Sequence, residues 1–314
     1  MDESDKISTD LPCIGGGEIP GAPGAPAFTL SRRSPSPIPV LVAVPHAGRT
    51  YPPSLLARMR DPDRAGIRLE DRYADLLGLR IAEETGAALI VARAPRAMID
   101  LNRAPGEMDW EMLEEGRPPG QMLARSGRRA RGGLGLVPRR LPGLGEIWNA
   151  RLGQGELEAR ISGVHAPYHA ALAAGLADLQ RRWGCALLID LHSMPPLGLD
   201  RGGRAVTEFV VGDRFGSSCA GALCAAAFDH FASCGRRAAH NRPYAGGYVL
   251  DRHCAPSRGL HAMQIEVCRS VYLDERLERP GPALEATAAV LAGLVRRLAD
   301  EMATLGHAFR QAAE

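Results

Sequence analysis

Three features that would place the chain in a common functional class are absent from its sequence. The net charge is only +2, with 38 Lys and Arg residues against 36 Asp and Glu residues, so no whole-protein field indicates nucleic acid as a partner. No apolar run approaches the roughly 20 residues that a membrane helix needs, and no internal repeat is evident. We therefore expect neither a nucleic-acid partner nor a membrane association.

The seven cysteines lack any paired CxxC spacing, and their number is odd. Several of them lie inside segments that we expect to be helices or strands, namely Cys185, Cys219, Cys224 and Cys268. This usage favours reduced thiols in a cytoplasmic protein over a disulfide framework.

The start of the chain lacks both the apolar segment and the basic stretch of a signal peptide, and it does not resemble a membrane anchor. Glycine and proline between residues 15 and 26 favour a flexible tail over residues 1–26, with order beginning near Ala27. The rest, with 45% hydrophobic residues overall, fits one elaborated domain over residues 27–314.

A Gly/Pro/Arg-rich insert at about residues 106–150 is the segment with the weakest pattern. A connection of this length is either a functional lid or disordered. Its locally basic run, residues 125–140, lies among glycines and prolines, which favours a solvated loop.

Two segments combine a short apolar run with a histidine at its end. Residues 187–189 run into Asp190 and Leu191, then His192 and Ser193, before two prolines. Residues 40–44 lead through Pro45 to His46. A short apolar run bounded by breakers predicts a buried strand, and α/β proteins place their sites where such strands end. Two histidines at two strand ends are typical of a metal site.

Two adjacent acids, Glu70 and Asp71, precede an expected helix that Gly86 terminates. A carboxylate at a helix start commonly caps free N–H groups and suits the helix dipole. It can also point back over the sheet edge toward His46, so one acid could cap while the other binds a metal.

Residues 98–103, preceded by Arg96, are predicted to form a short strand. Asp100 and Asn102 would lie on one face of it, near Arg103, and that face could line the same cleft. For Asp100 alone, an Asp–Arg pair that braces a turn is the favoured interpretation.

Two later segments add secondary candidates. His169 lies where the helical spacing of residues 154–184 is interrupted, and a histidine early in a helix is more often a structural partner than a ligand. Asn241 begins a loop that contains Gly246 and Gly247, where the absence of a side chain allows close approach of the backbone to a ligand.

Residues 260–269 alternate between two faces, one apolar and one that carries Gln264 and Glu266. Burial of a carboxylate is costly unless it is paired or functional. Glu266 is therefore either a catalytic base or a structural partner of Arg269 or another cation.

Strands are expected to alternate with helices along the whole chain, which predicts a three-layer α/β/α domain. The expected strands are residues 40–44, 87–93, 98–103, 187–191, 206–213 and 260–269, and a final amphipathic helix contains residues 291–302.

The motifs form an ordered series: Pro45-His46-Ala47-Gly48, Glu70-Asp71, Arg96 with Asp100-Leu101-Asn102-Arg103, Pro167-Tyr168-His169, Asp190-Leu191-His192-Ser193, Asn241 with Gly246-Gly247-Tyr248, and His261 with Gln264-Ile265-Glu266. This series resembles the N-formylglutamate amidohydrolase family, whose members carry the same motifs in the same order. The resemblance implies an α/β fold with a mixed central sheet, like that of the zinc carboxypeptidases and cell-wall amidases (phosphorylase/hydrolase-like), and zinc-dependent hydrolysis of a linear amide.

Carried over by position, the resemblance assigns one divalent metal, zinc, to His46, Asp71 and His192, with Asp71 a better match than Glu70. It assigns the role of base to Glu266. The sequence departs from the family in Ala47, where a serine is usual, in its long basic insert, and around residues 250–253.

The chemistry of these residues agrees with that assignment. Two histidines and one carboxylate leave a fourth zinc position for water, as in catalytic sites. Zinc lowers the pKa of such a water toward about 7, and Glu266 would take its proton and pass it to the leaving amine.

The expected substrate is a small acidic N-acyl amino acid such as N-formylglutamate. Guanidinium groups grip carboxylates bidentately, so Arg96 and Arg103 are the expected binding residues. Further binding groups and secondary candidates are Asn102, Gly246, Gly247, Glu70, His169, Ser193, Asn241 and Gln264.

Two other functions stay open at this point. A different zinc amidase, acting on N-acyl amino acids or on a peptidoglycan stem, would share the metal site and differ in its pocket. A non-catalytic binding protein on the same fold is disfavoured, because it has no use for a buried base. The sequence gives no indication of the oligomeric state.

Overall fold

The computed structural model describes residues 12–116, 127–198, 203 and 206–311. The strands are β1 (Cys13–Gly16), β2 (Phe28–Ser31), β3 (Val40–Val44), β4 (Ala88–Ala92), β5 (Arg140–Leu141), β6 (Gly145–Glu146), β7 (Ala186–Met194), β8 (Phe209–Gly212), β9 (Ala238–His240) and β10 (Leu260–Cys268). The α-helices are α1 (Pro53–Leu56), α2 (Pro62–Leu69), α3 (Ala74–Thr85), α4 (Arg128–Arg131), α5 (Gln154–Arg160), α6 (Ala166–Trp183), α7 (Gly221–Ser233), α8 (Tyr248–His253) and α9 (Leu284–Gln311). Short helical turns are η2 (Trp110–Met112), η4 (Ile161–His165), η5 (Pro256–Arg258) and η6 (Arg269–Val271).

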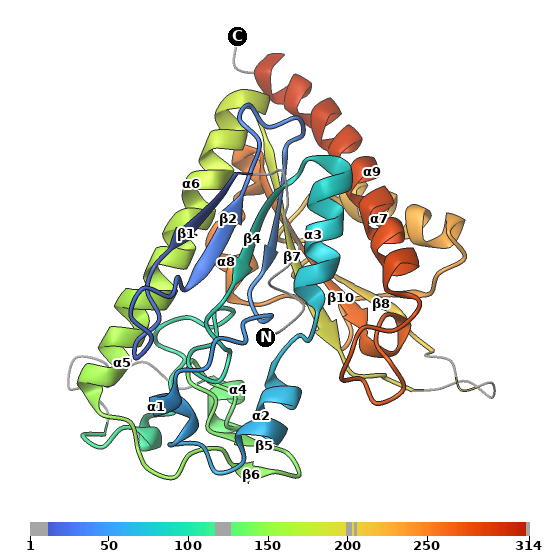
Figure 1. Cartoon of the computed structure of the whole chain (residues 1–314). Helices are drawn as coiled ribbons and strands as arrows, with labels where there is room; N and C mark the ends of the chain where they lie inside the picture. Colours follow the sequence, from blue (N-terminus) through green and yellow to red (C-terminus); the bar gives the residue numbers. More distant parts are fainter. Residues whose placement is uncertain (1–11, 117–126, 199–202, 204–205, 312–314) are drawn as a thin grey trace.

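A mixed sheet of eight strands forms the centre of the molecule, in the order β1-β2-β4-β3-β7-β10-β8-β9 (Figure 1). The four central strands, β4, β3, β7 and β10, run parallel to one another. Every residue of β3, β4 and β7 is buried, because a parallel sheet that is covered on both faces needs continuous apolar strands. This explains why the apolar runs of the sequence predicted these strands.

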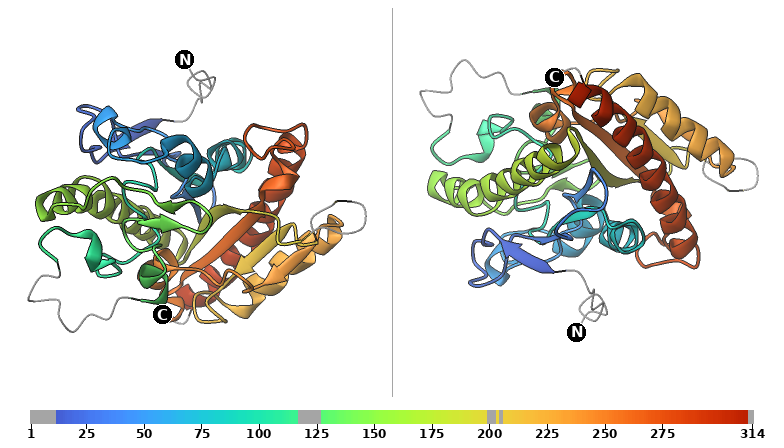
Figure 2. Two further views of the ribbon diagram at one scale, coloured as in Figure 1. Left: turned by 90° about the horizontal axis from the view of Figure 1, so that it is seen from below. Right: turned by 90° about the horizontal axis from the view of Figure 1, so that it is seen from above.

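Helices cover both faces of the sheet and make three layers, as the sequence predicts. Figure 2 shows the long α9 on one side of the sheet and α6 on the other. One apolar core lies between the sheet and α3, α7 and α9, and the second lies between the sheet and α6. In the described ranges, no helix is both long and apolar enough to cross a membrane.

The prediction of a flexible tail is wrong for residues 13–26. β1 pairs antiparallel with β2 at the edge of the sheet, and Ile19 and Ala27 are fully buried. Residues 1–11 of the predicted tail lie outside the described residues. Short segments rich in glycine and proline carry little periodicity, so the sequence pattern did not indicate their pairing.

The insert is also more ordered than a solvated loop. Leu136 and Val137 are fully buried, and Ile147 and Trp148 join the same apolar core as α6. The described part of the insert therefore packs on the domain, while residues 117–126 lie outside the described part.

Two predicted local structures are corrected. Residues 98–103 form turns, not a strand, and the Asp100 N–H donates to the Leu136 carbonyl of the insert at 2.7 Å. The predicted interruption near His169 is a five-residue π turn, η4, through which α5 continues into α6. A π turn keeps the chain helical while it shifts the phase of the side chains, and this shift accounts for the broken spacing.

Candidate active site

The candidate site lies at the carboxyl edge of the parallel strands. His46 follows β3, His192 lies near the end of β7, and Glu266 on β10 is the register partner of His192. Asp71 lies in the short link between α2 and α3, where its N–H donates to the His46 carbonyl at 2.8 Å. The sheet register and this backbone bond bring together four side chains that are distant in sequence.

The two histidines face the carboxylate of Asp71 with the same ring nitrogen. Asp71 Oδ2 lies 3.0 Å from His192 Nδ1 and 3.5 Å from His46 Nδ1. The ring centroids of the histidines are 4.7 Å apart, and all three side chains are buried. The three residues form one of the groups in the described part of the chain that can hold a metal ion.

The opposite nitrogen of each histidine bonds a second buried carboxylate. His46 Nε2 lies 2.7 Å from Asp100 Oδ1, and His192 Nε2 lies 2.8 Å from Asp190 Oδ2. Metal-binding histidines usually donate their other N–H to a carboxylate in this way, which fixes the tautomer and the ring orientation. The neutral rings would therefore present Nδ1 lone pairs to the centre.

The residues present fit a divalent ion. His46 Nδ1 is buried and, among the described residues, has no hydrogen-bond partner. Burial alone would raise the pKa of Asp71, but contacts with His192 and His46 hold it well below its usual range, so Asp71 stays anionic. Two imidazole nitrogens and one carboxylate form a donor set that suits zinc with one position left open.

Neither Glu70 nor Asp71 caps α3 with its side chain, although the sequence suggested that one of them could. The N-terminal residue of α3 is preceded by Tyr73, which has a left-handed φ of 56° and makes no side-chain cap. Glu70 accepts bonds from Tyr51 and Arg72 instead. The structure thus turns Asp71 toward the histidines and Glu70 away from them.

Glu266 is buried beside this cluster and bonds Gln264 Nε2 at 2.8 Å. Burial raises the pKa of Glu266 to about 8, with a further contribution from Asp71. Arg269 does not pair with it: its guanidinium bonds Ser193 Oγ at 3.0 Å and the Glu70 carbonyl. The structural partner that the sequence suggested for Glu266 is therefore occupied elsewhere.

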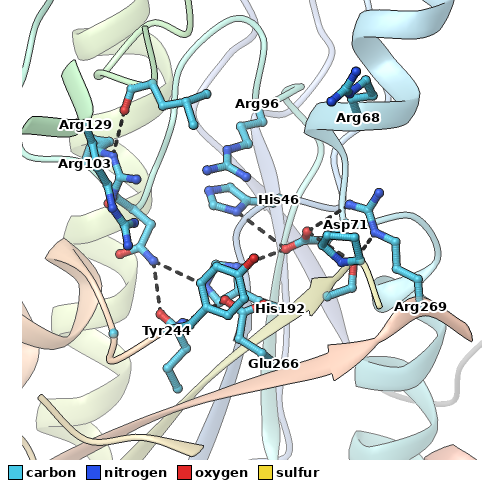
Figure 3. Close-up of a pocket in the computed structure, with 16 residues that line it drawn as sticks. His46, Arg68, Asp71, Arg96, Arg103, Arg129, His192, Tyr244, Glu266 and Arg269 are labelled. Carbon is cyan, nitrogen blue, oxygen red and sulfur yellow. Dashed lines mark hydrogen bonds and ion pairs between the residues drawn. The ribbon is translucent and has the colours of Figure 1, made fainter. Parts of the chain in front are cut away.

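Glu266, the two histidines and Asp71 line a cavity of about 350 Å³ that also contains five arginines (Figure 3). Arg96 bonds Asp100, which confirms the turn-bracing pair, and Arg103 bonds the Leu134 and Asn102 carbonyls. Arg68 on α2 and Arg129 on α4 are exposed. Within the described ranges, neither has a carboxylate partner.

Sequence reasoning missed Arg68 and Arg129 as candidates. Arg68 occupies the last turn of α2, and Arg129 belongs to the basic run that the sequence predicts to be a solvated loop. Arg68 lies two residues before the Glu70-Asp71 motif, a signal that could have identified it, whereas only the folded insert brings Arg129 to the cavity. A fifth arginine, Arg269, was considered only as a partner for Glu266.

Asn102 and the glycine loop meet on one side of the cavity. The Asn102 side-chain oxygen accepts from the Val249 N–H at 3.0 Å, and its amide nitrogen lies 3.4 Å from Asp190 Oδ2 and from Gln264 Oε1. A Cβ at Gly247 would lie 2.5 Å from Asn102 Oδ1. The close approach predicted for Gly247 is therefore to Asn102, while Gly246 lines the cavity.

Two other secondary candidates, Ser193 and His169, contact residues in or next to the site. Ser193 donates to Asp71 Oδ1 at 3.2 Å, and His169 Nε2 bonds the Leu101 carbonyl next to Asn102 at 3.0 Å. Asn241 does not line the cavity; its amide bonds Asp213 at 2.7 Å.

Fold and site together define a three-layer α/β/α protein with a buried His–Asp–His cluster at the carboxyl edge of a mixed sheet. The family model described as N-formylglutamate amidohydrolase matches residues 38–273. The chain belongs to the N-formylglutamate amidohydrolase family.

Individual relatives agree with this family. The N-formylglutamate deformylase of Pseudomonas aeruginosa is 28% identical over 279 residues, 83% of this chain and 92% of the relative. The crystal structure of N-formylglutamate amidohydrolase from Ralstonia eutropha superposes with a TM-score of 0.76 at 27% identity, over 91% of this chain and 99% of that one. A structure from Agrobacterium tumefaciens, at 19% identity and a TM-score of 0.62, shares the fold.

Proposed function

We propose that this chain is a metal-dependent amidohydrolase that cleaves N-formylglutamate, or a closely related N-acyl acidic amino acid, into the carboxylic acid and the free amino acid. The observation that carries the proposal is the buried His–Asp–His cluster beside Glu266 in a cavity lined by arginines. The names of its relatives, N-formylglutamate deformylase and N-formylglutamate amidohydrolase, support the same substrate.

His46, Asp71 and His192 would hold the ion, and zinc is the ion that their donor atoms suit best. Bound there, it would polarise the amide carbonyl and make a water molecule more acidic. Asp100 and Asp190 hold the two imidazoles with Nδ1 toward the centre. Ser193 and Arg269 fix Asp71 from the other side.

Glu266 acts as the general base in this proposal. It takes a proton from the water that attacks the amide carbonyl and returns that proton to the nitrogen of the leaving amine. The pKa of about 8 applies to the protein without the ion, and a nearby cation favours the ionised carboxylate. Gln264 orients Glu266 through the bond between their side chains.

The cavity arginines bind the carboxylates of the substrate. Arg96 and Arg103 each use part of the guanidinium on protein oxygens, and the remaining N–H groups are available to a ligand. Arg68 and Arg129 provide two further guanidinium groups at the cavity. Backbone at Gly246 and the side chain of Asn102 complete the proposed binding groups, while Gly247 leaves room for the Asn102 side chain.

We further propose a cytoplasmic location. All seven cysteines are free, which suits a reducing compartment. The arginines of the cavity support a small acidic N-acyl amino acid as the binding partner of this protein.

The test is turnover of N-formylglutamate by purified protein loaded with zinc. Turnover is measured as the release of formate and glutamate. N-acetylglutamate and a peptidoglycan stem peptide, run beside it, report on the other amidases that share such a metal site. Release of glutamate that disappears after chelation and returns with zinc is the expected result. A fully loaded, folded protein that hydrolyses none of these amides contradicts the proposal and favours a binding protein.

A further inference from the structure

A second group of metal-binding side chains lies outside the cavity, at the far edge of the sheet. Asp213 follows β8, Cys224 lies in the first turn of α7, and His240 ends β9. None of the three lines the candidate active site. Together they join three consecutive elements around the short edge strand β9.

The donor atoms of these residues are close enough to share one ion. Cys224 Sγ lies 3.1 Å from Asp213 Oδ2 and 3.6 Å from His240 Nε2, and His240 Nε2 lies 3.1 Å from Asp213 Oδ1. Zinc bonds of about 2.0–2.3 Å at tetrahedral angles place neighbouring ligand atoms roughly 3.3–3.6 Å apart. The observed separations differ from this range by a few tenths of an ångström at most. Oδ2 faces the thiol and Oδ1 faces the imidazole, so the carboxylate of Asp213 would bind the ion with both oxygens or turn one of them toward it.

Hydrogen bonds orient the carboxylate of Asp213 within this group. Asn241 donates to Asp213 Oδ1 at 2.7 Å, and the Gly216 N–H donates to the same atom at 3.0 Å, which leaves Oδ2 to face the thiol. These two N–H donors on one oxygen fix the orientation of the Asp213 carboxylate. This contact also gives a role to Asn241, which the active site does not use.

The group is accessible to an ion from solvent at His240. Its side chain is 47% exposed, whereas Asp213 and Cys224 are buried. The ring packs edge-on against Phe228 of α7 with centroids 5.4 Å apart, which holds its Nε2 toward the other two ligands. Cys219 lies within hydrogen-bonding reach of Cys224.

We propose that Asp213, Cys224 and His240 form a second, structural metal site for a thiophilic divalent ion of the zinc class. A thiolate, an imidazole and a carboxylate form a donor set that zinc accepts. The ion displaces the proton of the Cys224 thiol and links β8, α7 and β9. This would stabilise a three-residue edge strand that, in the described part of the chain, pairs with β8 alone.

The first experiment counts zinc per chain after removal of loosely bound metal. The parent protein is expected to hold two ions, and Cys224→Ser and His240→Gln one each, with turnover of the amide substrate retained. Cys234→Ser removes an exposed thiol at the C-cap of the same helix and should still hold two ions. One ion in the parent, or two in both Cys224→Ser and His240→Gln, overturns the proposal.

The second experiment replaces zinc with cobalt, whose bond to a thiolate gives a charge-transfer absorption band in the near ultraviolet. The candidate active site offers no sulfur ligand, so this band reports on Cys224. It should be present in the parent and in His192→Ala, and lost in Cys224→Ser. If Cys224→Ser fails to fold, His240→Gln at the exposed ligand must weaken cobalt binding at this band. Absence of the band in cobalt-loaded parent, or its persistence in Cys224→Ser, overturns the proposal.

Discussion

At the scale of single residues, Glu266 shows how burial and neighbours set a chemical role. It lies on the polar face of an apolar strand, its cationic neighbour Arg269 is engaged elsewhere, and its own contact in the described part is the neutral amide of Gln264. A buried carboxylate without a paired cation is costly to ionise, which explains why its pKa rises to about 8. A bound cation would favour the ionised carboxylate, which is the form that can accept the proton of a water molecule.

We predict that Glu266→Gln lowers turnover by about 100-fold or more, because the amide keeps the shape but cannot accept a proton. Metal content and melting temperature should stay close to those of the parent. In the parent, kcat/KM should fall as the pH drops through the pKa of Glu266, since the protonated carboxyl is no base. A lowered melting temperature with normal turnover of the folded fraction would instead assign Glu266 to structure.

The two exposed cavity arginines allow a test of substrate recognition. We predict that Arg129→Gln and Arg68→Gln each lower kcat/KM for N-formylglutamate by about 10- to 100-fold, because a charge-assisted hydrogen bond contributes about 1.5–3 kcal/mol. The arginine that binds the side-chain carboxylate should show little loss with N-formylglutamine, which lacks that charge. Equal losses on both substrates in both variants would rule out recognition of that carboxylate by Arg68 and Arg129.

At the scale of elements, the sequence predicted the strands that carry the site. β3 and the first half of β7 are apolar runs because both faces of the sheet are covered, and β10 keeps one apolar face. Helix α3 is followed by Gly86, whose φ is +74°. The sequence failed where backbone groups bond outside regular elements. Residues 98–103 resemble a strand, but Asp100 bonds the insert and braces Arg96.

Three histidines lie close together next to the site: His165 in η4, His169 in α6 and His253 in α8. His169 Nε2 donates to the Leu101 carbonyl, so in the neutral ring Nδ1 accepts from His253 Nε2 at 2.9 Å. His165 Nε2 donates to the Arg103 carbonyl at 2.9 Å. The histidines thereby hold the backbone on both sides of Asn102.

We predict that this cluster makes folding sensitive to acid. Burial lowers the pKa of His253 to about 4, with a smaller contribution from Arg252, while the unfolded value is about 6.5. The unfolded chain therefore binds the proton first, and stability present above pH 6.5 is lost as the pH falls toward 4. His253 alone should account for about 2 kcal/mol between pH 7 and pH 5.

The measurement is urea unfolding of the parent and of His253→Gln at these two pH values. Glutamine keeps a donor for His169 but has no titration. The loss of unfolding free energy between pH 7 and pH 5 should be smaller in the variant by about 2 kcal/mol. Identical losses in both proteins would show that His253 does not contribute.

At the scale of the whole molecule, the site exists only when the sheet is complete. His46, Asp71, His192 and Glu266 come from four separate segments, and Arg129 comes from the insert. Sequence motifs could identify the first four, because each follows or lies on a recognisable element. The position of Arg129 depends on the packing of Leu136 and Trp148 into the core, which no local pattern encodes.

Because the ion would bind the folded chain and not the unfolded one, its binding should appear as global stability. At a free concentration 1,000-fold above Kd, one site adds about 4 kcal/mol to the free energy of unfolding. We predict that zinc raises the melting temperature of the metal-free protein. The Cys224→Ser background isolates the ion at the candidate active site, and there His192→Ala should abolish the rise. An unchanged rise in the double variant would mean that His46, Asp71 and His192 do not form the site through which zinc stabilises the fold.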